Sequence, residues 1–90
     1  MYPADEPDVH DLGLGVYLMW DQDGQGFSWH HPACRGWAGL RFMPDPDSTG
    51  HVLIAGGTQD TAGLTIQGSL LCPMGCGAHG FIRGGRWVPC

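Results

Sequence analysis

Lysine and asparagine are absent from this sequence, and four arginines face nine aspartate and glutamate residues. The formal net charge is therefore −5 at pH 7. A protein that follows nucleic-acid phosphates needs a basic surface, because most of its affinity comes from pairing cations with phosphates. The composition disfavours nucleic acid as a partner.

Long apolar runs are also missing, and none approaches the ~18 residues that a membrane-spanning helix requires. Residues 1–11, MYPADEPDVHD, contain neither the cationic segment nor the apolar stretch of a secretory signal. We expect no membrane partner and a cytoplasmic location. We also expect a flexible acidic tail over residues 1–11, followed by one small β domain over residues 12–90, since 90 residues suffice for a single core.

Stretches without glycine or proline are short, because the chain contains 16 Gly and 7 Pro. The longest such stretch runs only from Val16 to Asp23, whereas helices average about 11 residues. Period-two alternation, as in Leu12, Leu14, Val16, Leu18 and Trp20, favours strands instead. We predict an all-β fold, a small sandwich or open barrel of about six or seven short strands. The expected strands are 12–20, 27–31, 37–43, 51–55, 64–71, 80–83 and 86–88, with loops at 44–50 and 56–63.

Catalytic signatures are lacking as well. The sequence contains no H-x-E with P-C-x-x-C, no HExxH, no P-loop lysine and no G-x-S-x-G. We therefore expect a protein that is not an enzyme.

Cysteine and histidine, in contrast, gather in two turns. One is HHPAC, which gives His31-x2-Cys34, and the other is CPMGCGAH, which gives Cys76-x2-His79. A two-residue spacer lets a tight turn aim two side chains at one metal ion, and zinc prefers a tetrahedron of sulfur and nitrogen ligands. In a cytoplasmic protein, cysteines at such spacings indicate metal ligands more than disulfides. We expect a structural zinc site.

Two ligand sets fit this pattern. The first pairs the two knuckles, His31 and Cys34 with Cys76 and His79. The second replaces His31 with Cys72, since C-x3-C is also a usual ligand spacing and CPMGCG resembles a rubredoxin-type knuckle with one extra residue. We therefore expect four ligands from His31, Cys34, Cys72, Cys76 and His79, with Cys90 as a weaker candidate.

Arginine accompanies tryptophan at two places, Arg35 near Trp37 and Arg86 beside Trp87. Tryptophan and arginine are enriched at the energetic centres of protein interfaces. These four residues are the predicted partner-binding surface.

The C-terminal segment SLLCPMGCGAHGFIRGGRWVPC, residues 69–90, resembles small actinobacterial and actinophage proteins that share a domain of unknown function. Those proteins have a C-x-x-H-x-F-I-R-x-G-x-W-like ending, which corresponds here to residues 76–87, and an upstream cysteine turn, which corresponds to residues 28–37. That upstream turn often holds more cysteines in the family, and only Cys34 matches it here. The resemblance implies a metal-bound β fold and a phage or actinobacterial source.

These observations lead to one expectation and two alternatives. We expect a zinc-stapled interaction module, encoded by a phage and binding a host or phage protein in the host cytoplasm. The alternatives are a structural component of a phage particle and a small metal-dependent enzyme, in which one zinc position would stay open.

Overall fold

The computed structural model describes residues 8–32, 36–72 and 77–90, and these residues form only strands, turns and loops. This confirms the all-β prediction. In chain order the strands of the described residues are β1 (Val9–Asp11), β2 (Tyr17–Trp20), β3 (Gly26–His30), β4 (Ala38–Arg41), β5 (Val52–Gly57), β6 (Asp60–Gln67), β7 (Leu70–Leu71), β8 (His79–Arg83) and β9 (Arg86–Pro89).

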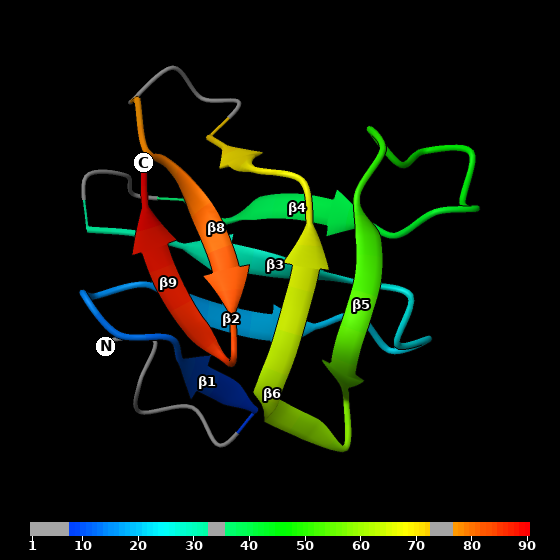
Figure 1. Cartoon of the computed structure of the whole chain (residues 1–90), viewed down its shortest axis with the longest axis horizontal. Helices are drawn as coiled ribbons and strands as arrows, with labels where there is room; N and C mark the ends of the chain where they lie inside the picture. Colours follow the sequence, from blue (N-terminus) through cyan, green and yellow to red (C-terminus); the bar gives the residue numbers. More distant parts are fainter. Residues whose placement is uncertain (1–7, 33–35, 73–76) are drawn as a thin grey trace.

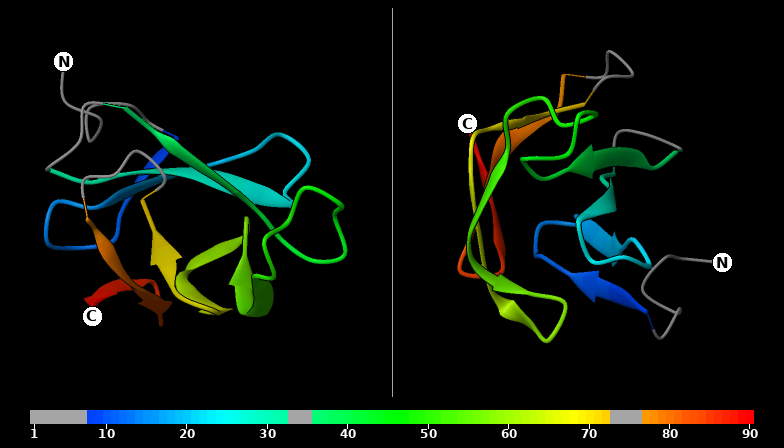
Figure 2. Two further views of the ribbon diagram at one scale, coloured as in Figure 1. Left: turned by 90° about the horizontal axis from the view of Figure 1, so that it is seen from above. Right: turned by 90° about the vertical axis from the view of Figure 1, so that its right-hand side faces the viewer.

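The strands build two facing layers (Figure 1). One layer is an antiparallel sheet in the order β1-β2-β3-β4. The other contains the β5–β6 hairpin beside the β7-β8-β9 sheet, and its strands cross those of the first layer at a steep angle. Figure 2 shows the two layers edge on, with the core between them.

Single backbone hydrogen bonds tie these parts together. The Met43 N–H donates to the His51 carbonyl at 2.8 Å, which joins the layers beyond β4 and before β5. At the opposite edge the Trp87 N–H of β9 donates to the Leu12 carbonyl at 2.8 Å. Within the second layer, the Gly85 N–H donates to the Leu64 carbonyl at 2.8 Å and connects the two smaller sheets. The result is a sandwich linked along both sides.

Both layers supply the core. Leu18 and Phe27 from the first layer, and Leu64 and Ile82 from the second, have no exposed surface. The Trp29 ring of β3 stacks on the Trp87 ring of β9, with centroids 5.2 Å apart and an interplanar angle of 27°. Because the sheets are amphipathic on a two-residue period, each can bury one face against the other.

The strand predicted over residues 12–20 is wrong in its first half. Gly13, Leu14 and Gly15 have φ angles of 87°, 56° and 78°, in the left-handed region that glycine adopts without strain. The chain therefore turns here, and the Leu12 N–H donates to the Val16 carbonyl at 2.8 Å. The alternation arises because Leu12 and Val16 enter the core from the two sides of a turn.

This turn also changes the domain boundary. Val9–Asp11, which we expected in the flexible tail, pair with Tyr17–Met19 of β2 as strand β1. The sheet therefore begins three residues before the predicted start at residue 12. Val9 and His10 are half-buried in this strand, so apolar and partly apolar side chains of the segment pack on the sheet despite its acidic composition.

The loop predicted over residues 56–63 is instead the end of a hairpin. Strands β5 and β6 extend to Gly57 and Asp60, which face each other across a two-residue turn. Bulges between Leu53 and Ala55, and again before Gly57, allow these glycine-rich residues to stay paired. The strand predicted over 64–71 is interrupted at Gly68, whose φ is 103°, so β6 and β7 are separate strands. The separation of β6 from β7, together with the additional strand β1, explains why the described residues hold more strands than predicted.

Candidate functional site

The described ends of the two predicted knuckles lie at one end of the sandwich. His31 follows β3 and is buried, with its ring centroid 5.4 Å from that of Trp29. His79 begins β8 and is exposed. Two backbone bonds shape this end, since the Cys72 N–H donates to the Ala78 carbonyl at 2.9 Å and the Cys90 N–H donates to the His79 carbonyl at 3.0 Å.

His31 and His79 line the same cavity, which has a volume of about 390 Å³. Pro32, Ala78 and Trp87 form other parts of its wall. Strands β3 and β8 belong to different layers, so the fold brings together two imidazoles that are far apart in the sequence. This is the arrangement that pairing of the two knuckles requires.

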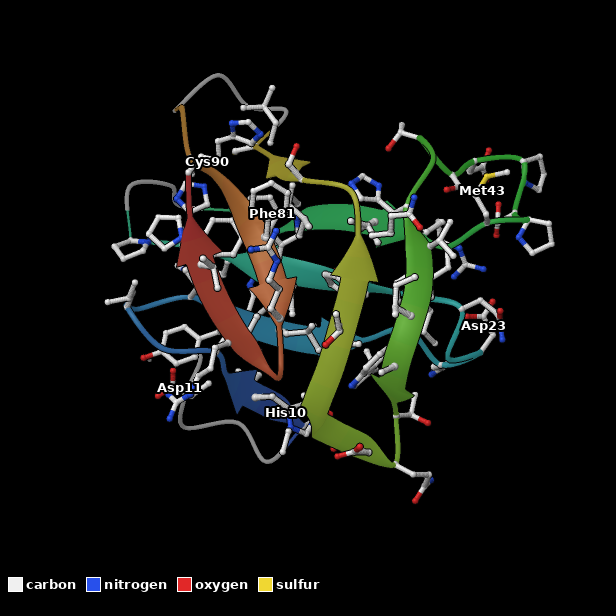
Figure 3. The ribbon with its side chains drawn as sticks, in the orientation of Figure 1. His10, Asp11, Asp23, Met43, Phe81 and Cys90 are labelled. Atoms are coloured by element: carbon white, nitrogen blue, oxygen red, sulfur yellow. The ribbon has the colours of Figure 1, made fainter. Side chains whose placement is uncertain are left out.

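Two of the four cysteines belong to the described residues. Cys72 is buried in the core, and Cys90 is exposed at the end of the chain (Figure 3). Cys34 and Cys76 lie outside the described residues. Within the described ranges, no group of three or more His, Cys, Asp or Glu side chains is arranged to hold a metal ion.

Burial affects the chemistry of His31. The low-dielectric surroundings disfavour the charged imidazolium, and the neighbouring His30 adds repulsion, so the pKa of His31 lies below its usual range. A neutral imidazole is the form that binds a metal.

The predicted partner-binding residues that the structure describes differ in how exposed they are. Trp87 is 8% exposed and packs in the core, where its ring stacks on that of Trp29. Trp37 is half-buried against His30, with ring centroids 5.4 Å apart, and Arg86 is exposed. Arg35 lies outside the described residues.

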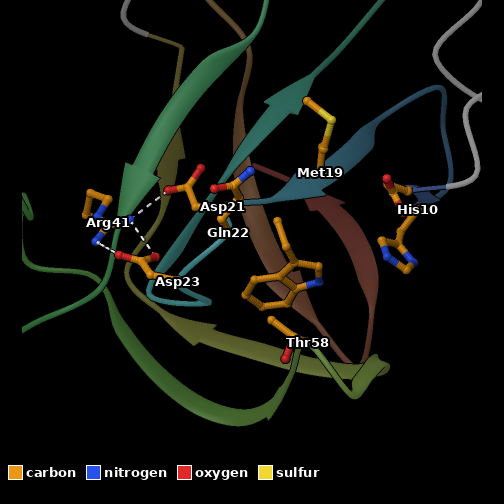
Figure 4. Close-up of a pocket in the computed structure, with 9 residues that line it drawn as sticks. His10, Met19, Asp21, Gln22, Asp23, Arg41 and Thr58 are labelled. Atoms are coloured by element: carbon orange, nitrogen blue, oxygen red, sulfur yellow. Dashed lines mark hydrogen bonds and ion pairs between the residues drawn. The ribbon is translucent and has the colours of Figure 1, made fainter.

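A second candidate site, which no sequence pattern indicates, is an open cleft of about 940 Å³ near the β2–β3 turn. Its lining includes His10 and Asp23, both labelled in Figure 3, and shares no residue with the histidine cavity. Its walls come from β1, β2, β4 and the turns after β2 and β5, as Figure 4 shows. The lining residues are Asp8, His10, Met19, Trp20, Asp21, Gln22, Asp23, Arg41 and Thr58.

Arg41 forms the charged end of this cleft. Its Nη1 donates to Asp21 at 2.9 Å and to Asp23 at 3.0 Å. Its Nη2 contacts Asp23 at 2.6 Å and Asp45 at 2.8 Å, and its Nε donates to Asp45 at 2.9 Å. Hydrogen bonds to Asp23, Asp21 and Asp45 raise the pKa of the Arg41 guanidinium above its usual range.

Hydrogen bonds in this cluster lower the pKa of two of the carboxylates, Asp23 and Asp45. The hydrogen bond from Arg41, followed by that from the Gln25 N–H, lowers the pKa of Asp23 to about 2. The Asp47 N–H, followed by Arg41, lowers the pKa of Asp45. The sequence segments DQDGQG and PDPD indicated only turns, because nothing in their spacing showed that Arg41 would join them.

No protein-family model, curated protein or solved structure matches this chain. The resemblance of residues 69–90 to the actinophage proteins therefore stays a prediction. No helix long and apolar enough to cross a membrane occurs in the part of the chain that the structure describes.

Proposed function

We propose that this chain is a non-enzymatic protein-binding module whose fold is stabilised by one zinc ion. Four ligands would come from His31, Cys34, Cys72, Cys76 and His79. The observation that carries the proposal is the shared cavity of His31 and His79, because each imidazole belongs to a different predicted knuckle.

The chain length on each side of this cavity also supports the proposal. Cys34 follows Pro32 by two residues and Cys76 precedes Gly77 by one, and both Pro32 and Gly77 line the cavity. Consecutive Cα atoms are about 3.8 Å apart, so these short connections suit ligands directed at one point. Cys72, buried one position after β7, is the fifth donor near this end.

A structural role for the metal fits the rest of the chain. A site with four protein ligands leaves no position for a reacting water, and the sequence lacks the motifs of metal-dependent enzymes. A core of this size is marginal on its own, and zinc binding to small domains contributes on the order of 10 kcal/mol to folding. The reducing cytoplasm keeps the thiols available as ligands. The partner would be a protein of the host or, on the resemblance above, of a phage.

Metal content tests the proposal directly. We expect elemental mass spectrometry to find about one zinc per chain in protein purified without a tag or added metal. Cys76→Ser should lose the zinc and lower the melting temperature sharply, whereas Cys90→Ser, the matched control, should keep both. Wild-type protein that holds no metal and shows four titratable thiols would contradict the proposal.

A further inference from the structure

The cleft beside Arg41 combines a concave shape with one-sided charge. Among the described residues, the carboxylates of Asp8, Asp21 and Asp23 line it together with the guanidinium of Arg41. His10 is half-buried at the other end of the cleft, as Figure 4 shows. The whole chain has a formal charge of −5, so the surrounding field has the same sign as the cleft.

The guanidinium of Arg41 is already occupied by carboxylates. Every nitrogen of the Arg41 guanidinium contacts at least one carboxylate, and Asp45 adds a partner that lies outside the cleft lining. Arg41 therefore has little capacity to bind an anionic ligand. Asp21 uses only its Oδ2 toward Arg41 within the described residues, and Asp8 is exposed. These two carboxylates remain able to attract a cation.

An aromatic side chain, Trp20, also lines the cleft. The Trp20 indole N–H donates to Thr61 Oγ1 at 3.0 Å, and its ring meets Phe27 edge-on with centroids 5.8 Å apart. These contacts hold the ring in place at the cleft, next to Met19, which is 37% exposed. An immobilised indole beside carboxylates suits a cation attached to an apolar stem, because the stem packs on the ring and the charge interacts with its π face.

We propose that this cleft binds a lysine or arginine side chain from a basic segment of a protein partner. The stem packs against Trp20, and the charged head interacts with the carboxylates of Asp8 and Asp21. This inference rests on the proposed function only in taking the chain to be a protein-binding module, and it adds the surface and the chemistry of the partner. It does not depend on the proposed zinc ion, because the cleft shares no lining residue with the cavity of His31 and His79.

A basic peptide provides the probe. We would titrate ¹⁵N-labelled, metal-retaining protein with a capped tetra-arginine peptide at low salt and follow amide and indole signals by NMR. The largest shifts are expected at the Trp20 indole N–H and around Asp21. Added salt should weaken binding, because part of the attraction is between exposed charges.

Two matched variants separate the cleft from the total charge. Asp8→Asn removes one negative charge from the cleft, and Asp47→Asn removes one from an exposed loop position that does not line it. We expect Asp8→Asn to raise the peptide Kd about two- to fivefold, as for an exposed ion pair, and Asp47→Asn to change it less. Trp20→Leu should weaken binding by a similar factor through loss of the ring.

Three results would overturn this inference. They are equal weakening by Asp8→Asn and Asp47→Asn, shifts centred on Trp37 rather than Trp20, and no shift at all in folded protein. The second result would leave the proposed function intact and move its surface to Trp37. Failure of the zinc measurement alone would reject the metal staple without affecting the cleft.

Discussion

Arg41 shows how one residue can organise two loops. Its guanidinium joins the β2–β3 turn, through Asp21 and Asp23, to the loop after β4, through Asp45. Exposed ion pairs taken singly contribute little to stability, but a guanidinium that several carboxylates share fixes its partners with one loss of side-chain freedom. The same arrangement occupies the guanidinium charge that Arg41 could otherwise offer to a ligand in the cleft.

This cluster predicts a pH dependence at Asp23. Its pKa falls from 3.8 to about 2 on folding, because Arg41 and the Gln25 N–H stabilise the carboxylate. The unfolded chain then binds more protons, so this contribution to stability is complete above about pH 4 and is lost as the pH falls through about 2. We expect denaturant unfolding to show Asp23→Asn as less stable than wild type at pH 6, with the difference shrinking toward pH 2.

The comparison needs a control for general acid effects. Asp47→Asn removes a carboxylate in an exposed position, so its stability difference from wild type should change less over this range. A difference between Asp23→Asn and wild type that is the same at pH 6 and pH 2 would contradict the assignment to a carboxylate held ionised by Arg41.

Among the elements, the β5–β6 hairpin depends on the backbone conformation at Gly56. Gly56 has a φ of 80°, and a Cβ built there would lie 2.7 Å from the Asp60 carbonyl oxygen and from the backbone of Leu64. Both obstacles are backbone, so no side-chain rotation can relieve them. The bulge that keeps the hairpin paired therefore requires glycine.

Gly56→Ala should destabilise the fold by about 2 kcal/mol or more, since left-handed strain and a backbone clash add. Gly39→Ala in β4 is the matched control, because a Cβ there meets nothing within 4 Å and its φ is not in the left-handed region. We expect Gly39→Ala to change the unfolding free energy by no more than about 1 kcal/mol. Chemical denaturation measures both, and similar losses in the two variants would contradict this account of the bulge.

The elements also show how far the sequence could lead. Strand identity followed from alternation and from the density of glycine and proline, and it was correct for residues 27–30, 38–41 and 80–83. Gly13 and Gly15 led to a wrong prediction for the first half of residues 12–20, because glycine fits a strand pattern and a left-handed turn equally well. The opposite error occurred at Gly56 and Gly57. These two glycines predicted a loop, whereas the chain forms bulged strands there.

At the scale of the whole molecule, the histidine cavity and the cleft differ in how well the sequence alone could predict them. The cysteine and histidine spacing is local, so the sequence could predict candidate ligands, and the structure then placed His31 and His79 on one cavity. The cleft collects residues from Asp8 to Thr58 across both layers. No spacing rule connects such positions, because the cleft exists only once the layers cross.

Contact between the layers is most direct at Trp29 and Trp87. These rings stack with centroids 5.2 Å apart, and each belongs to a different layer. Stacked aromatic pairs contribute about 0.5–1.5 kcal/mol beyond the area they bury. If the sandwich folds as one unit, this coupling must appear in the global unfolding free energy and not only in local spectra.

A double-mutant cycle measures that coupling. Trp29→Leu and Trp87→Leu, singly and together, should give an interaction energy of about 0.5–1.5 kcal/mol in equilibrium unfolding. Trp20 provides the control, because it lines the other cavity and makes no ring contact with Trp87 in the described part of the chain. Trp20→Leu and Trp87→Leu should therefore add within about 0.5 kcal/mol.

Additive effects at Trp29 and Trp87, or unfolding transitions that differ between near-UV and far-UV circular dichroism, would mean that the two layers are stabilised separately. Coincident transitions with a measurable coupling would show that the layers hold each other in place, so that the cleft and the histidine cavity share one cooperative fold.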